Sequence, residues 1–144
     1  MVKEFSADGL SFAYPDEWAL ECEDNPNGWT VTLQSPGRAF AVVHLDRELE
    51  RTIEEVALAT LDTLKQDYPK LQAESAIETM AGEMAIGHDI EFFSLDADVT
   101  CWTRCFYGLA GIVVVMCQAT GLDQEDYEPV LRAICASMRA EDEP

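Results

Sequence analysis

The two histidines are the first residues to consider for chemistry, because imidazole binds metals and transfers protons near neutral pH. His44 is followed two residues later by Asp46, and His88 has Asp89 and Glu91 beside it. On a β-strand a His-x-Asp pair lies on one face about 7 Å apart, a distance that a metal ion bridges. A closed site needs about four ligands, and each segment supplies only two. We therefore expect no bound metal; a zinc site would point first to His44, Asp46 and His88.

Five cysteines are the next reactive groups: Cys22, Cys101, Cys105, Cys117 and Cys135. Their number is odd and no two are closely spaced, so in a reducing compartment we expect five free thiols. Cys101 and Cys105 lie in a segment rich in strand-forming residues, where they would share a face about 13 Å apart, beyond disulfide reach. Whether Cys105 faces Cys117 depends on the register of a hairpin at Gly111, which the sequence leaves open.

Signatures of covalent catalysis are missing from the sequence. No serine lies in a Gly-x-Ser-x-Gly elbow, no cysteine adjoins a histidine, and there is no glycine-rich phosphate loop. The adjacent Glu54 and Glu55 are explained by a helix N-terminus, where acids compensate the helix dipole. These observations favour a non-catalytic protein without a cofactor. The alternative is a small hydrolase or metal-dependent enzyme whose site is assembled from distant residues.

Three residues are candidates for binding a protein partner: Trp102, Arg104 and Phe106. On a strand they share one face, opposite Cys101 and Cys105. An arginine between two aromatic residues is typical of interface centres. The same composition also lines a covered sheet face beside an arginine whose head reaches water. The first interpretation makes them the binding site, and the second makes them core residues.

Two helices and a series of strands are expected to position these side chains. Thr52 and Glu55 form a capping box for a helix over 52–68, and a second helix over 126–139 would place Pro129 in its first turn. Alternation and turn residues predict strands near 10–14, 18–22, 29–34, 40–45, 71–80, 84–94, 99–109 and 112–120. Residues 112–117 are apolar without alternation, which predicts a central strand covered on both sides.

Strands dominate this pattern, with one helix in the middle and one at the end. It predicts an α+β fold in which one antiparallel β-sheet is flanked by helices on both faces. The length fits a single domain over 1–144, with 141–144 as a solvated tail.

Charge restricts the partners. Twenty-eight acidic against nine basic residues give a net charge of −19, which repels nucleic-acid phosphates and anionic lipid surfaces. The acids are scattered, as on a surface that serves solubility, although an acidic face also steers a basic partner. The N-terminus has no leader pattern and the longest apolar run is too short to span a bilayer, so we expect a cytoplasmic protein. The oligomeric state stays open.

The opening segment, Asp8 to Trp18, resembles the first strands of the PsbP/DcrB-like superfamily, and residues 134–139 resemble the segment that ends many members. That superfamily includes photosystem extrinsic subunits, a Ran-binding nucleotide-release factor and effector-binding chaperones of type VI secretion. The resemblance covers nearly the whole chain in element order. It implies a three-layer α/β/α sandwich used as a binding scaffold, such as a protein-binding adaptor or chaperone-like module. No functional residue of the superfamily is carried over.

Overall fold

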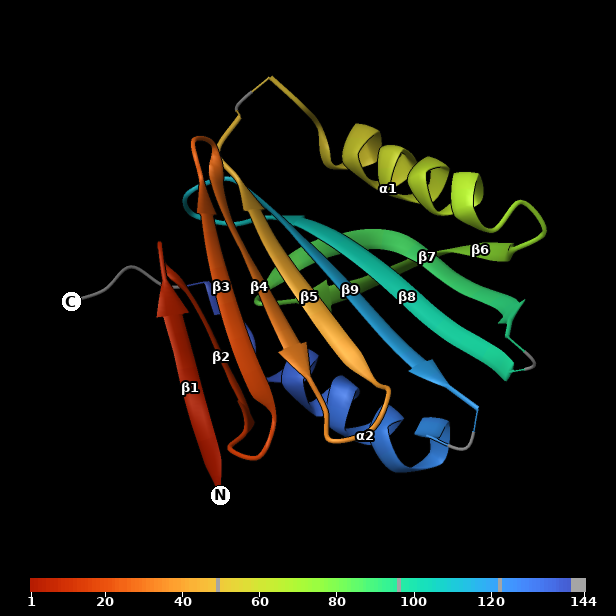
Figure 1. The fold of residues 1–144 in the computed structure, drawn as a ribbon. Helices are drawn as coiled ribbons and strands as arrows, with labels where there is room; N and C mark the ends of the chain where they lie inside the picture. Colours follow the sequence, from red (N-terminus) through yellow and green to blue (C-terminus); the bar gives the residue numbers. More distant parts are fainter. Residues whose placement is uncertain (49, 96, 122, 141–144) are drawn as a thin grey trace.

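A seven-stranded antiparallel sheet dominates the computed structural model, which describes residues 1–48, 50–95, 97–121 and 123–140 (Figure 1). Its spatial order is β3-β4-β5-β9-β8-β7-β6. The strands are β3 (Ala19–Asn25), β4 (Gly28–Gln34), β5 (Phe40–Asp46), β6 (Gln72–Met80), β7 (Glu83–Ser94), β8 (Ala97–Tyr107) and β9 (Ile112–Thr120). A second sheet contains β1 (Val2–Ala7), β2 (Leu10–Pro15) and β10 (Arg139–Ala140), and the helices are α1 (Ile53–Asp67) and α2 (Asp123–Ala136).

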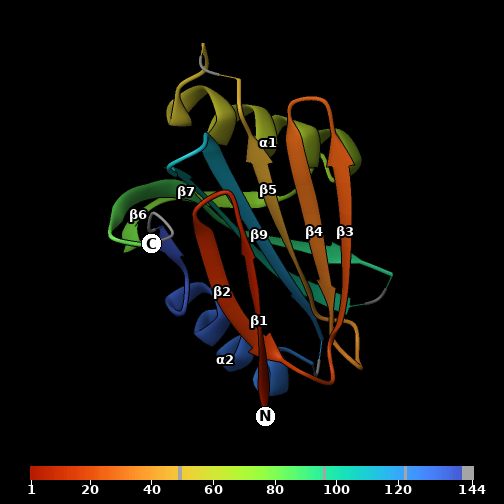
Figure 2. The ribbon, with the colours of Figure 1, turned by 90° about the vertical axis from the view of Figure 1, so that its left-hand side faces the viewer.

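The expected three-layer α/β/α sandwich, with one sheet flanked by helices on both faces, is wrong. Strands make up 55% of the chain and helices 21%, and the strands form two sheets. Helix α1 packs mainly on β7 and β8, whereas α2 packs on β9 and on β2 of the small sheet. Figure 2 shows β1 and β2 beside α2. Helix α1 covers only the part of the large sheet near β7 and β8, and α2 shares its side with the small sheet, so only the broad α+β class holds.

The small sheet was predicted only in part: the strand near 10–14 is confirmed as β2, but β1 and β10 were not predicted. Asp8 and Gly9 have φ of +52° and +80°, as the two central residues of a type I′ turn require. The strand before this turn begins with three exposed residues and shows no alternation. Phe5 stacks on its cross-strand partner Phe12, with ring centroids 5.1 Å apart, and also contacts the ring of Trp29 on β4, with centroids 5.2 Å apart.

The two helices differ in how well their starts were predicted. Helix α1 begins after Thr52, whose hydroxyl accepts the Glu55 N–H at 3.2 Å, which confirms the predicted N-cap. Helix α2 begins at Asp123, three residues earlier than predicted, so Pro129 lies inside the helix and not in its first turn. The acids of the new first turn face the positive end of the helix dipole and favour the earlier start. Neither helix is long and apolar enough to cross a membrane, in the part of the chain that is described.

Strand β9 occupies the centre of the large sheet, as its apolar sequence predicted. Val113 and Val115 join the main core with Leu131 of α2, and Ile112 packs in a second cluster with Ile53 of α1. The two faces of β9 therefore pack in two different hydrophobic clusters.

One row of cross-strand neighbours shows where the cover over the sheet ends. It runs across β4, β5, β9, β8, β7 and β6 through Leu33, Ala41, Cys117, Trp102, Asp89 and Glu74. The first four are buried, and the last two are exposed. The sheet thus emerges from beneath α2 at β7 and β6, where its side chains become acidic.

Candidate functional site

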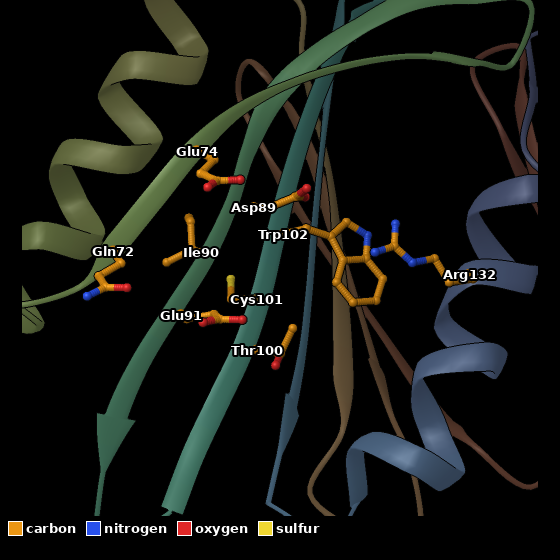
Figure 3. A pocket seen from close by; sticks show the side chains of 9 residues that line it. All are labelled: Gln72, Glu74, Asp89, Ile90, Glu91, Thr100, Cys101, Trp102 and Arg132. Atoms are coloured by element: carbon orange, nitrogen blue, oxygen red, sulfur yellow. The ribbon is translucent and has the colours of Figure 1, made fainter.

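A hollow of about 290 Å³ lies where the sheet emerges from beneath α2 (Figure 3). Strands β6, β7 and β8 form its floor, and Arg132 of α2 lies on the other side. We define the acidic groove by its polar floor residues: Gln72, Glu74, Asp89, Glu91 and Thr100. An adjoining hollow of about 390 Å³ shares Gln72, Glu91 and Thr100 and continues to Phe93 and Gln124. The acidic groove is therefore open and extended, a shape that suits a chain segment.

Trp102 and Arg132 close the end of the acidic groove next to α2. The Arg132 guanidinium lies over the Trp102 ring, 4.0 Å from its centroid. One Arg132 nitrogen is also 3.7 Å from a Glu128 carboxylate oxygen, one helical turn away. The cation–π contact and the tryptophan packing together join α2 to the sheet at this point.

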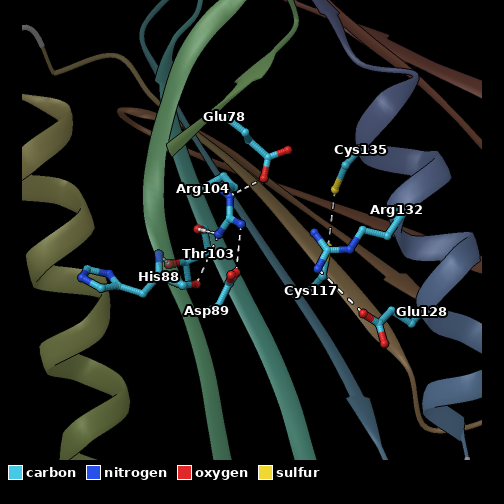
Figure 4. Close-up of polar contacts among 9 residues, drawn as sticks. All are labelled: Glu78, His88, Asp89, Thr103, Arg104, Cys117, Glu128, Arg132 and Cys135. Carbon is cyan, nitrogen blue, oxygen red and sulfur yellow. Dashed lines mark hydrogen bonds and ion pairs between the residues drawn. The ribbon is translucent and has the colours of Figure 1, made fainter. Parts of the chain in front are cut away.

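Arg104 lies behind the acids on the same sheet face and is 3% exposed (Figure 4). Its Nε donates to Glu78 at 2.6 Å and its Nη2 to Asp89 at 2.8 Å, while Nη1 donates to the Thr103 carbonyl at 2.8 Å. Burial acts to lower the pKa of Arg104, but the hydrogen bonds and charges of Asp89 and Glu78 outweigh it and raise that pKa. Arg104 is therefore a fixed cation that holds two carboxylates in position.

The structure places all three predicted binding residues inside the protein. Trp102, Arg104 and Phe106 share one strand face, as predicted, and are 2%, 3% and 0% exposed. Trp102 borders the acidic groove, Arg104 reaches it through Asp89, and Phe106 packs in the main core. Direct contact of these three side chains with a partner remains a prediction, and their burial argues against it.

The acids of the groove were missed by sequence reasoning, because they come from two different strands. Glu74 and Glu78 alternate along β6, as do Asp89 and Glu91 along β7. The two acids of each pair lie an even number of residues apart, so each pair indicates an acidic face on its own strand. Their meeting depends on the register that sets Glu74 opposite Asp89, which no local pattern supplies.

The chemistry of the groove favours binding over covalent catalysis. Cys101 belongs to the strand floor, but its side chain packs on the opposite sheet face with Leu61 of α1, and burial raises the pKa of this thiol to about 12. Cys101 is consequently protonated at neutral pH and a poor nucleophile. None of the described lining residues is a histidine that could act as its base.

The two histidines lie on separate strands, β5 and β7, with β9 and β8 between them. Three strand spacings separate them by about 14 Å, too far to share a metal ion. His44 Nδ1 lies 2.8 Å from the Thr30 hydroxyl and borders a different hollow, of about 310 Å³, beneath α1. Desolvation lowers the pKa of His88, with help from the charges of Lys65 and Arg104 and against that of Asp89. Among the described residues no three potential metal ligands come together.

A cysteine pair that the sequence did not single out lies close to the groove. The Sγ atoms of Cys117 on β9 and Cys135 on α2 are 3.7 Å apart (Figure 4). Their hydrogen bond and burial raise the pKa of Cys117, whereas bonds from Cys117 and from Trp102 lower the pKa of Cys135. The register of the β8–β9 hairpin sets Cys105 opposite Val114, so Cys105 does not face Cys117.

Comparison with known proteins identifies the fold. No protein-family model and no curated protein matches the sequence. The solution structure of cyanobacterial PsbP (CyanoP) from Synechocystis sp. PCC 6803 has a TM-score of 0.68 at 14% identity, covering 96% of this chain and 92% of that one. The PA94 protein of unknown function from Pseudomonas aeruginosa gives 0.58 at 13% identity, covering 99% and 98%.

A third similar structure is LpqN, involved in cell envelope biogenesis of Mycobacterium tuberculosis. Its TM-score is 0.53 at 15% identity, and the match covers 98% of this chain and 92% of that one. At sequence identities this low, structural similarity supports a shared fold and says nothing about function. The resemblance of residues 8–18 and 134–139 to the PsbP/DcrB-like superfamily is confirmed at the level of fold: the chain has the PsbP-like fold.

Proposed function

We propose that this protein is a non-catalytic binding protein whose acidic groove takes a positively charged segment of a protein partner. The observation that carries the proposal is the groove itself: an open hollow with the carboxylates of Glu74, Asp89 and Glu91 on a strand floor. The adjoining hollow extends it along β7 and β8. Such a site offers length and charge without convergent catalytic groups.

The charge of the site favours a cation. Arg104 compensates Asp89, and Arg132 is itself paired with Glu128 at 3.7 Å. Glu74 and Glu91 are left as the further acids of the groove, while Lys70 lines the adjoining hollow. The net charge of −19 adds a long-range field that raises the association rate of a basic segment. Binding is therefore expected to weaken as salt increases, because exposed charges are screened within about 10 Å at 0.1 M ionic strength.

The predicted binding residues have distinct roles in this proposal. Trp102 is buried and holds Arg132 over its ring, so the two side chains together form the end of the groove next to α2. Arg104 is a positioning residue that orients Asp89, and Phe106 supports the strand from the core side. The alternative, a hydrolase or metal-dependent enzyme, is less well supported because Cys101 is protonated at neutral pH and the two histidines are about 14 Å apart. Five free cysteines, four of them buried, fit the cytoplasm as the proposed setting.

The test is a titration with a deca-lysine peptide followed by amide chemical shifts. We expect shifts confined to the acidic groove and the adjoining hollow. The double variant Glu74→Gln/Glu91→Gln should weaken binding at least about tenfold, the equivalent of about 1.4 kcal/mol.

The matched control is Glu21→Gln/Glu23→Gln on β3, an equally exposed strand at the opposite edge of the sheet. It removes the same charge and should leave the affinity nearly unchanged. Shifts spread over the whole surface, with equal weakening by both double variants, would mean that the peptide responds to net charge alone.

A further inference from the structure

Strand β6 is the last strand of the large sheet, and no other described strand pairs with its outer side. Natural edge strands avoid further pairing with proline, charged side chains, bulges or short length. On β6 the charges are Glu74 and Glu78, which disfavour an added strand unless it is basic on their face. Strand β6 has nine residues, neither proline nor lysine, and an uninterrupted register with β7. Its outward N–H and C=O groups are therefore available to an added strand.

The two faces of β6 differ in chemistry. Glu74 and Glu78 lie on the face of the acidic groove. On the other face Ile77 is 73% exposed, and its diagonal neighbour Met84 on β7 is 56% exposed. This second face is the one where Ile86, opposite Ile77, packs against the α1 cluster. An added strand would meet carboxylates on one side and exposed apolar side chains on the other.

A second copy of this chain meets unfavourable charges at this edge when it pairs symmetrically about Ala76. Antiparallel pairing of β6 with itself, centred on Ala76, would set Glu74 of each copy opposite Glu78 of the other. Like charges directly opposite are destabilising. A strand with positive charge on that face reverses the sign of the interaction.

The other edge, β3, fits less well. Its exposed acids Glu21 and Glu23 share a face, but Leu20 on the other face packs against the core. No large exposed apolar side chain lies on β3 to receive an apolar row. The combination of an acidic face and an exposed apolar face is found at β6.

We infer that an extended segment of a protein partner adds to β6 as an eighth strand, with basic and apolar side chains in alternation. This inference rests on the proposed function and specifies the partner. Basic side chains lie along Glu74 and Glu78 and reach the acidic groove, and apolar ones lie along Ile77 and Met84. Backbone hydrogen bonds to β6 supply affinity, and the alternation supplies specificity.

The test uses two ten-residue peptides of the same composition, one alternating lysine and valine, the other with five lysines followed by five valines. We expect the alternating peptide to bind at least about tenfold more tightly, because only it matches both faces of β6. Amide hydrogen exchange within Gln72–Met80 should slow when it binds. Methylation of alternate backbone nitrogens of the peptide should remove this protection and weaken binding about tenfold, through lost hydrogen bonds.

Two matched protein variants complete the experiment. Ile77→Lys places a charge in the apolar row and should weaken the alternating peptide about tenfold. Leu109→Lys makes the same change at a 54% exposed site beyond the end of β8 and should have no effect. If Ile77→Lys does not fold, strand addition is tested by comparing the methylated and unmethylated alternating peptides on the unsubstituted protein.

The possible failures are distinguishable. Equal affinity of the two peptides, or protection of β3 in place of β6, overturns strand addition while leaving the cation-binding groove intact. If neither peptide binds, or if the β3 double variant weakens them as much as the groove double variant, the proposed function fails as well.

Discussion

Replacing Trp102 by alanine should destabilise the fold strongly, because this side chain joins α2 to the sheet. Trp102 is 2% exposed and belongs to the main core. Truncation of a buried tryptophan to alanine costs about 3–5 kcal/mol. The Arg132 guanidinium 4.0 Å from the ring centroid contributes about 0.5–1 kcal/mol of that loss. In a chain of this size we expect the melting temperature to fall by about 6–20 °C.

Urea unfolding of Trp102→Ala and Trp102→Phe measures this loss, since the phenylalanine retains an aromatic ring and should lose less. Adding Arg132→Ala to each background tests the stacking. The loss caused by Arg132→Ala should be smaller, by about 0.5–1 kcal/mol, when Trp102 is already alanine. The peptide titration is then repeated at a temperature where both variants are folded.

A loss below about 1 kcal/mol for Trp102→Ala would refute the reasoning, because surface substitutions rarely exceed about 0.5 kcal/mol. If peptide binding were abolished with stability retained, Trp102 would be a contact residue with little structural role. That result would conflict with the burial of Trp102 and would support the original prediction that Trp102, Arg104 and Phe106 form the binding face.

Three further predictions concern charge and thiols. Burial lowers the pKa of His88, so the unfolded chain takes up the proton first as pH falls below about 6.5. The folded protein should therefore lose stability below that pH, and His88→Gln should flatten the fall in melting temperature. Arg104→Met leaves two half-exposed carboxylates without their cation and should cost about 1–3 kcal/mol in urea unfolding. Denatured, unreduced protein should titrate five thiols. Because the exposed Cys22 would form a mixed disulfide with a small disulfide reagent, the oxidation test uses Cys22→Ser: its four thiols should fall to two as Cys117 joins Cys135, and adding Cys135→Ser should keep all three remaining thiols.

Local patterns were enough to place most strands of the large sheet. Alternation marked β4 and β5, and the unbroken apolar run identified β9 as central. Of the small sheet, β2 was predicted, but β1 and β10 were not, because β10 has only two residues and β1 begins exposed. Strand β10 pairs with β2 from the other end of the chain, so the sequence around it carries little information about its existence.

The candidate site was less predictable than the fold for a related reason. The alternation of Trp102, Arg104 and Phe106 correctly indicated a shared strand face, but it does not reveal what covers that face. Coverage is decided by where α2 and the small sheet pack. The same strand pattern would fit a buried row and an exposed one, and in this chain one row contains both: buried at Trp102, exposed at Asp89 and Glu74.

The uncovered edge of the sheet follows from the widths of its parts. An α-helix with its side chains is about 10 Å across, which equals about two strand spacings of about 4.8 Å. Helix α1 accordingly covers β7 and β8, and α2 with the small sheet covers the opposite face near β9. Two helices of 15 and 14 residues leave β6 open on both faces, and its nine residues are exposed except at Ala76 and Met80. On β6, Glu78 pairs with Arg104 and Met80 packs in the main core. Ile77, 73% exposed, is an apolar residue that packing does not explain. Binding of a complementary strand supplies a reason for it.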